Sequence, residues 1–488
     1  MIRTPAGYGG GIRIKRYQDY FQAGYGATQL AANELFTPAQ LFASGAQGFW
    51  YDTSDLSTMF QDAAGTVPAA LEQPVSYRAD KSGRGNYAFQ VTSANAPVLS
   101  ARVNLLTYTE QLTNVAWTVS GTTVTDNQTA APNGSLTASE LKETATTAGH
   151  SISTSTTTVA GVSYRGYVYL KQGTQRYAVV SIATGASSEV RYSAVVDLQS
   201  GTITQNNTLN SPTGTSSSIL PLGNGWYSVT LTQAATTTTS LLVVAMSDTG
   251  TPSSFAANTL NPSYAGSTSN YIYVTQADLR ASSEASALPV YQRVVTATNY
   301  DVISFPYYLR YNGSSQSLRT NSINFSTTDK MSIFAGLRKL TDSSAQVITE
   351  LSSNGTNNTG TFSALAYNAF DAPPSTYSFY SRGSTAAVGA LTTSATYVRP
   401  STNVYTGLSD IAGDLVTLRL NGTQVAQNTA DQGTGNYTNN PVFFSARNSA
   451  ALWFNGRDYG MVCVGRALTT YEVTTTELWL AAKTGLVI

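Results

Sequence analysis

Tyr308 to Lys339 reads YLRYNGSSQSLRTNSINFSTTDKMSIFAGLRK, and this stretch decides the fold class. Apolar and polar residues alternate up to a polar turn at Asn312-Gly313, and a second strand-like piece covers Ser317 to Phe325. After a polar break, Met331 to Leu337 again places apolar residues at every second position. Period-two runs separated by Gly, Asn and Asp turns are typical of antiparallel strands with one face on a core. Because the pattern continues almost to the end of the chain, we predict an all-β protein built from antiparallel sandwiches.

Two later pieces of the sequence extend this interpretation. They are Thr406 to Ala426 and Phe454 to Gly465, and with the opening stretch they resemble a concanavalin A-like, laminin-G-type jelly roll of the kind found in bacteriophage virion proteins. That family typically has a strand reading LRLNG, here Leu418 to Gly422, and a C-terminal helix with a Trp, here Thr470 to Lys483. The resemblance implies a lectin-like sandwich in residues 300–488.

The beginning of the same sandwich is found much earlier in the chain. WYDTSDLSTMFQD at Trp50 to Asp62 and DKSGRGN at Asp80 to Asn86 resemble the opening of that family, which we assign to residues 37–103. Residues 104–299 therefore read as an inserted domain, which a surface loop accommodates easily because the two ends of a domain usually lie close together. With Gln276 to Leu279 and Pro289 to Arg293 near its end, the insert resembles the carbohydrate-binding-module-like jelly rolls of phage tail and appendage proteins.

Residues 1–36 differ from the rest, with clustered glycines, basic residues and tyrosines but no amphipathic period. One interpretation is a poorly ordered terminus, which is common. The other is an arm that orders on a capsid or tail protein, since Tyr and Arg are enriched at interfaces. For the second interpretation, the candidate virion-attachment residues are Arg13, Lys15, Arg16, Tyr17, Tyr20, Phe21 and Tyr25.

The charge balance excludes several partners. Charged residues make up 11% of the chain, and Lys+Arg and Asp+Glu are both 27, so neither nucleic acid nor an anionic membrane has an electrostatic attraction to it. No apolar run approaches the ~20 residues of a membrane-spanning helix, and no secretion signal is visible. We expect assembly in a host cytoplasm and release as part of a virion, and the resemblance to phage appendages implies a homo-oligomer.

The sequence contains few residues suited to catalysis or to binding a cofactor or metal. The only His is His150, and nothing near it resembles a nucleophile elbow. Ligand clusters for a metal are absent, although Asp410 and Asp414 leave a calcium site conceivable beside the simpler explanation of a turn. The E-x-D-x-x-E motif of concanavalin-like glycanases is absent too. We expect a protein that is not an enzyme and binds no cofactor, with polysaccharide cleavage as the enzymatic alternative.

Glycan binding has better support. Tyr outnumbers Phe by 30 to 16, and exposed Tyr rings with Asn, Ser and Asp can bind sugar faces and hydroxyls. The candidate carbohydrate-binding residues are Tyr367, Tyr377, Tyr380 and Arg382 around Pro373-Pro374, with Tyr264 and Arg176 in the insert. The alternative is that these Tyr residues belong to ordinary sheet surface or core edge. We therefore predict a phage appendage (tail fibre, head fibre or decoration protein) that binds host-surface glycans, with a purely architectural virion protein as the competing hypothesis.

Overall fold

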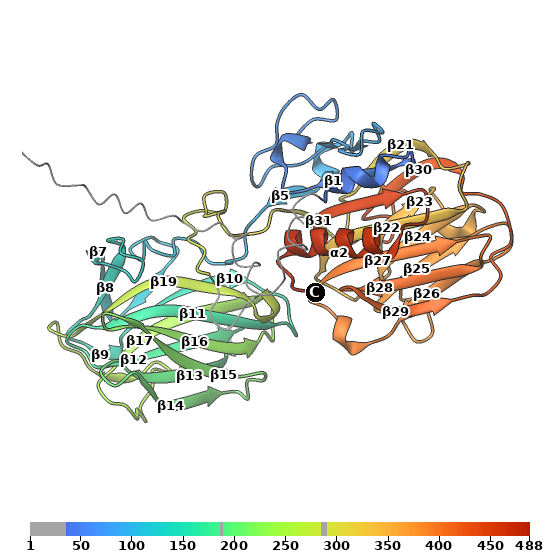
Figure 1. Cartoon of the computed structure of the whole chain (residues 1–488). Helices are drawn as coiled ribbons and strands as arrows, with labels where there is room; N and C mark the ends of the chain where they lie inside the picture. Colours follow the sequence, from blue (N-terminus) through green and yellow to red (C-terminus); the bar gives the residue numbers. More distant parts are fainter. Residues whose placement is uncertain (1–35, 186–188, 285–289) are drawn as a thin grey trace, which may run out of the picture.

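The computed structural model describes residues 36–185, 189–284 and 290–488, and the fold it shows is nearly all β. Figure 1 shows two β-sandwiches, one formed by the blue, orange and red parts of the chain and the other by the teal-to-yellow part. The prediction of an all-β fold of antiparallel sandwiches is confirmed. The candidate attachment residues from Arg13 to Tyr25 lie outside the described residues.

The first sandwich, called here the split sandwich, combines segments from both ends of the chain. The strands of its eight-stranded sheet are β1 (Gly48–Asp52), β5 (Val98–Ser100), β20 (Tyr308–Asn312), β22 (Lys330–Lys339), β27 (Ser401–Asp410), β28 (Leu415–Leu420), β29 (Thr423–Asn428) and β31 (Asn455–Val464). Their order is β29-β28-β27-β22-β31-β20-β5, with β1 also paired to β31. Because β5 and β20 pair directly, with Leu99 opposite Leu309, the chain leaves and re-enters the sheet at adjacent strands.

The opposing sheet of the split sandwich has nine strands. They are β2 (Met59–Phe60), β3 (Tyr77–Arg78), β4 (Ala88–Phe89), β21 (Leu318–Asn324), β23 (Gln346–Leu351), β24 (Thr361–Tyr367), β25 (Tyr377–Arg382), β26 (Ala387–Thr392) and β30 (Asn439–Phe444), in the order β2-β3-β4-β21-β30-β23-β24-β25-β26. The stretch from Tyr308 to Lys339 thus crosses between the sheets twice, since β20 and β22 lie in one and β21 in the other. The Asn312 side chain accepts the Ser314 and Ser315 N–H groups at 3.0 Å and Gly313 has φ +72°, which turns the chain at the first crossing.

The second sandwich, called the inserted sandwich, consists of two six-stranded sheets. One contains β6 (Thr118–Ser120), β10 (Ser151–Thr157), β12 (Tyr177–Thr184), β13 (Val190–Asp197), β14 (Thr202–Leu209) and β17 (Thr239–Ser247). The other contains β7 (Thr122–Thr129), β8 (Ala138–Glu143), β11 (Ser163–Gln172), β15 (Ser216–Gly223), β16 (Trp226–Ala234) and β19 (Tyr271–Ala281). A small third sheet pairs β9 (Thr147–Gly149) with β18 (Ser263–Ala265).

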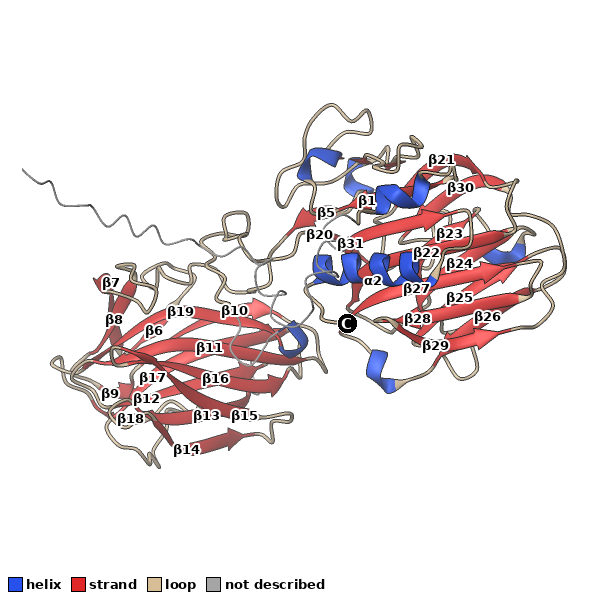
Figure 2. Cartoon of the chain, viewed as in Figure 1, coloured by secondary structure: helices blue, strands red, loops and turns tan. Residues whose placement is uncertain are grey.

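Figure 2 shows how little of the described chain is helical. The short 3-10 helices are η2 (Pro38–Phe42), η3 (Leu56–Thr58), η4 (Ser93–Asn95), η5 (Ser282–Glu284), η6 (Gly355–Asn357) and η7 (Ala395–Tyr397). The predicted C-terminal helix is α2 (Thr470–Thr484), and a capping box between Thr469 and Glu472 begins it. Leu480 of α2 packs with Trp50, Phe334 and Val462 over the eight-stranded sheet. Within the described residues, no helix is long and apolar enough to cross a membrane.

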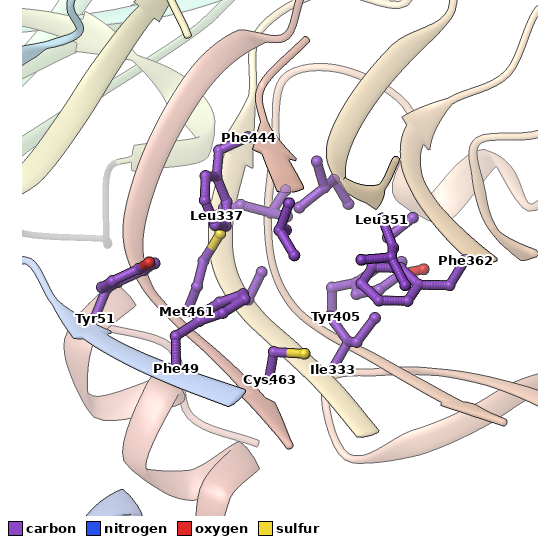
Figure 3. Close-up of a cluster of buried hydrophobic side chains, with 14 of the residues drawn as sticks. Phe49, Tyr51, Ile333, Leu337, Leu351, Phe362, Tyr405, Phe444, Met461 and Cys463 are labelled. Atoms are coloured by element: carbon purple, nitrogen blue, oxygen red, sulfur yellow. The ribbon is translucent and has the colours of Figure 1, made fainter. Parts of the chain in front are cut away.

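The core of the split sandwich joins residues that are far apart in sequence. In Figure 3, Phe49 and Tyr51 of β1 lie beside Met461 and Cys463 of β31, with Phe444 of β30 from the other sheet. The Phe49 and Tyr51 rings stack at 4.8 Å between centroids. Cys463 is fully buried, as the apolar run around it predicts, and burial raises the pKa of its thiol. The residues before the insert therefore complete the same core as the residues after it.

Two linkers connect the sandwiches, and Gln292 joins one to the other. Its side-chain oxygen accepts the backbone N–H groups of Val103 (2.7 Å) and Asn104 (3.0 Å). Its side-chain amide donates to the carbonyls of Ala101 and Asp301, both at 2.9 Å. Gln292 is fully buried, so every hydrogen-bonding direction of its amide is used inside the protein. The outgoing and returning linkers are thereby fixed side by side.

Candidate functional site

A cavity of about 670 Å³ lies on the inserted sandwich, where β19 and both linkers meet the connection between β7 and β8. Its volume falls in the range of small-ligand sites. The lining residues come from four parts of the chain: Tyr108, Thr109, Glu110, Gln111; Asn127, Asn133, Ser135, Thr137; Gln276; and Val290, Tyr291, Arg293, Val294, Val295, Asp301. Most of these side chains are polar, which distinguishes the lining from the apolar core beneath it.

The backbone around the cavity is unusual. Tyr108, Asn127 and Gln276 all line it and have φ values of +51°, +59° and +54°, in the left-handed region that side-chain-bearing residues seldom adopt. The pairing of β11 with β19 shifts register between the pairs Tyr167–Asp278 and Tyr169–Thr275. Gln276 lies in this irregular segment of β19. A bulge of this kind redirects a side chain, and such residues gather at ligand sites. Here the bulge places Gln276 in the cavity lining.

Buried polar groups form the base of the cavity. Glu110 is 9% exposed and Gln276 is 3% exposed. The side chains of Gln276 and Tyr291 lie beside the Glu110 carboxylate, where their donor groups act to lower its pKa. Burial raises the pKa of Glu110 above its ordinary value, and Asp301 adds to the rise while Arg293 opposes it. The Tyr291 hydroxyl also lies 2.6 Å from the Thr109 hydroxyl, and burial raises the pKa of Tyr291. The base is thus a fixed acceptor with oriented donors around it.

The mouth of the cavity is more exposed. Arg293 and Asp301 form an ion pair there at 3.0 Å, with side chains 38% and 45% exposed. The lining residue Val290 is 62% exposed. Planar polar groups beside apolar side chains suit a ligand that has both hydroxyls and C–H faces, as a sugar ring has. Such an arrangement can hold a saccharide without reacting with it.

Among the residues predicted from the sequence, Tyr377 is wrong as a sugar contact. It is fully buried, its hydroxyl accepts a hydrogen bond from the Asn403 amide at 3.2 Å, and the Lys339 ammonium lies 4.5 Å from its ring centroid. Tyr377 and Phe379 share the inward face of β25, whereas Tyr380 and Arg382 occupy positions of the opposite face. The prediction failed because alternation alone does not say which of the two faces is buried.

The other three candidates of the split sandwich are half-buried on neighbouring strands. Tyr367 ends β24, and Tyr380 and Arg382 lie on β25. The Tyr380 hydroxyl donates to Asp371, and Arg382 donates to the carbonyls of Thr356 (3.0 Å) and Asn357 (2.8 Å). These contacts hold loops at the edge of the sheet. Their role in sugar binding remains a prediction.

The two candidates of the inserted sandwich are not in the cavity lining. The Tyr264 hydroxyl donates to Glu143 at 2.5 Å, and its ring lies 4.8 Å from that of the buried His150. Arg176 is exposed and holds Asp197 by two hydrogen bonds, which lowers the pKa of Asp197. Both side chains anchor turns, and the structure brings neither of them to Glu110 or Gln276.

The cavity itself was missed by the sequence analysis. Glu110 and Gln276 fall in the opening and closing pieces of the insert, but no pattern in the sequence indicates a left-handed residue at Gln276 or links it to Glu110. The sequence left a calcium site at Asp410 and Asp414 open beside a simple turn, and the described part of the chain has no group of three or more His, Cys, Asp or Glu side chains placed to hold an ion. Asp410 instead pairs with Lys330 at 3.1 Å.

Comparisons with known proteins give only distant structural similarity. No family model matches the chain, and no curated protein matches it. The binding domain of botulinum neurotoxin serotype G is 12% identical with a TM-score of 0.29, over 36% of this chain and 43% of that one. The CBM40 of Ruminococcus gnavus IT-sialidase, bound to alpha2,3 sialyllactose, is 15% identical with a TM-score of 0.24, over 31% and 83%. Domain 4 of AbnA, a GH43 extracellular arabinanase from Geobacillus stearothermophilus in complex with arabinotriose, is 14% identical with a TM-score of 0.26, over 34% and 75%.

The chain therefore spans less than half of the neurotoxin binding domain that it matches. Its class is set by its own topology: an all-β protein with two antiparallel sandwiches, in which segments before and after the inserted sandwich share the sheets of the split sandwich.

Proposed function

We propose that this protein binds surface glycans without cleaving them, in the cavity of the inserted sandwich. The observation that carries the proposal is the base of the cavity, where Glu110 and Gln276 are buried as polar groups and Gln276 has a left-handed backbone. Strained backbone clusters at ligand sites, and binding pockets carry a few precisely placed polar groups. The exposed Val290 at the mouth adds the apolar contact that a sugar ring accepts.

The biological setting is part of the same proposal. The resemblance of residues 37–103 and 300–488 to lectin-like phage virion proteins supports an appendage of a bacteriophage particle, assembled as a homo-oligomer. Residues 1–36 would attach it to a capsid or tail protein, and the glycan would belong to the host surface. In this setting the inserted sandwich provides recognition and the split sandwich provides the rigid support.

Polysaccharide cleavage is the second candidate, because two carboxylates line one cavity. Glu110 has a raised pKa from burial, as a general acid requires, and Asp301 is the second carboxylate. The Asp301 carboxylate is, however, held in an ion pair by Arg293, so it is not a free base. Incubation with polysaccharide separates the two functions, since cleavage shortens the chains and binding does not.

The direct test is a pull-down on host cells and on their extracted surface polysaccharide with the wild-type protein and Gln276→Gly. Glycine adopts the left-handed conformation freely, so this change removes the side chain and keeps the backbone. We expect the affinity for polysaccharide to fall about tenfold or more, as the loss of a buried hydrogen-bonding group predicts. The free energy of unfolding should stay within about 1 kcal/mol of the wild type.

Asn258→Gly is the matched control, since Asn258 is exposed, has φ +59° and lies outside the cavity lining. It should bind like the wild type. Unchanged binding by Gln276→Gly would contradict a site at this cavity. Binding by neither wild type nor variants would favour the purely architectural virion protein.

A further inference from the structure

The charges of the cavity define the kind of glycan that it accepts. Among the described residues, its lining contains three charged side chains, Glu110, Arg293 and Asp301, and no Lys or His. The one cation that the described part of the chain contributes to the lining, Arg293, is already paired with Asp301 at 3.0 Å. With Glu110 ionised, the lining therefore carries one net negative charge, and that charge lies at the buried base.

The groups around the lining do not reverse this balance. Behind Tyr291, the Asp278 carboxylate is tied to the Arg280 guanidinium, so this pair is neutral. Beside Asn127, the Asp126 carboxylate accepts hydrogen bonds from the Leu112 N–H at 3.0 Å and the Ser139 hydroxyl at 2.7 Å. Asp126 adds negative charge near the cavity, and the described lining has no unpaired cationic side chain to compensate for it.

The base of the cavity also has spare capacity to accept hydrogen bonds. A carboxylate offers about four acceptor positions, more than the two neighbouring side chains of Gln276 and Tyr291 can fill at Glu110. The groups that fit the remaining positions are donors: a hydroxyl, the N–H of an acetamido group, or an ammonium. A uronic or sialic acid carboxylate would instead face a like charge in a partly buried site, which is unfavourable.

From this arrangement we propose that the cavity selects neutral or amino-bearing glycans and rejects acidic ones, with Glu110 as the discriminating residue. The inference rests on the proposed glycan-binding function and specifies its ligand class. Val290 at the mouth, 62% exposed, provides an apolar contact for sugar C–H faces or for the methyl of an N-acetyl group.

The experiment compares one set of bacterial surface polysaccharides in three chemical forms: native, carboxyl-reduced and de-N-acetylated. Binding of the full-length protein is measured at neutral pH and low salt, where charge effects are largest. For polysaccharides that contain uronic or sialic acids, carboxyl reduction should tighten binding about fivefold or more. De-N-acetylation, which exposes amines, should keep or strengthen binding.

Glu110→Gln removes the charge and keeps the shape, so the difference between native and carboxyl-reduced forms should shrink to about twofold or less. Glu140→Gln is the matched control, because Glu140 lies on β8 of the same sandwich but not in the lining, and it should keep the wild-type preference. Tighter binding of native acidic forms, or equal binding of all forms, would overturn this inference and leave the glycan-binding function standing. Binding of no polysaccharide in any form would overturn the function as well.

Discussion

Glu284→Gln is expected to lower the free energy of unfolding of the split sandwich by about 3 to 5 kcal/mol. Glu284 ends η5 of the inserted sandwich and forms ion pairs with Arg338 of β22 and Arg457 of β31, both at 3.2 Å. The Arg338 and Arg457 side chains are 1% and 10% exposed. Removing the carboxylate leaves two nearly buried guanidinium groups without their anion, and an unpaired buried charge is strongly destabilising.

The same contact predicts a dependence on pH. Burial alone would raise the pKa of Glu284, but Arg457 and Arg338 outweigh it and hold that pKa below its ordinary value. A carboxylate with a lowered pKa in the folded state contributes its full stabilisation above the unfolded pKa, near 4.5. The contribution is lost as the pH falls through the lower, folded pKa. The wild type should therefore lose more stability than Glu284→Gln on acidification below about pH 4.5.

Urea unfolding followed by Trp fluorescence measures both effects. Asp329→Asn is the control, since it breaks the exposed pair with Lys330 (side chains 26% and 34% exposed) and should cost about 1 kcal/mol or less. If Glu284→Gln lowers the free energy of unfolding no more than this control does, then Arg338 and Arg457 are adequately solvated without Glu284. The contact between the sandwiches would then contribute no more than an exposed ion pair.

More of the fold than of the candidate site could be predicted from the sequence, and the reason is physical. Strands and turns depend on local alternation and on residues such as Gly313, and the helix at Thr470–Thr484 depends on its own capping residues. The cavity depends instead on a register shift near Gln276 and on Glu110, which is distant in sequence. Tyr377 shows the same limit at a single position, because the buried face of β25 is decided by the opposing sheet. Contacts of this type are set by tertiary packing rather than by local pattern.

Arg78→Met is expected to cost about 3 to 5 kcal/mol of folding free energy. Arg78 on β3 and Asp458 on β31 form an ion pair at 2.5 Å with side chains 2% and 1% exposed. The Arg78 guanidinium also donates to Thr53 and lies 5.0 Å from the Tyr51 ring centroid. This pair links the segment before the insert to a strand near the end of the chain, across the two sheets of the split sandwich. Met fills similar space but leaves Asp458 charged inside the core.

A double variant tests whether the cost comes from the unpaired charge or from the lost contact. Arg78→Met with Asp458→Leu removes both charges, so it should recover most of the stability, as replacement of a buried pair by apolar residues often does. The recovery will be incomplete because Asp458 also accepts the Gly460 N–H at 2.8 Å. The urea midpoint and slope of the three variants against wild type give the coupling energy between the two side chains. A double variant as unstable as the sum of the single ones would mean that the two charges do not stabilise each other, and that strand pairing (β1 with β31, β5 with β20) and core packing, rather than this ion pair, join the two parts of the split sandwich.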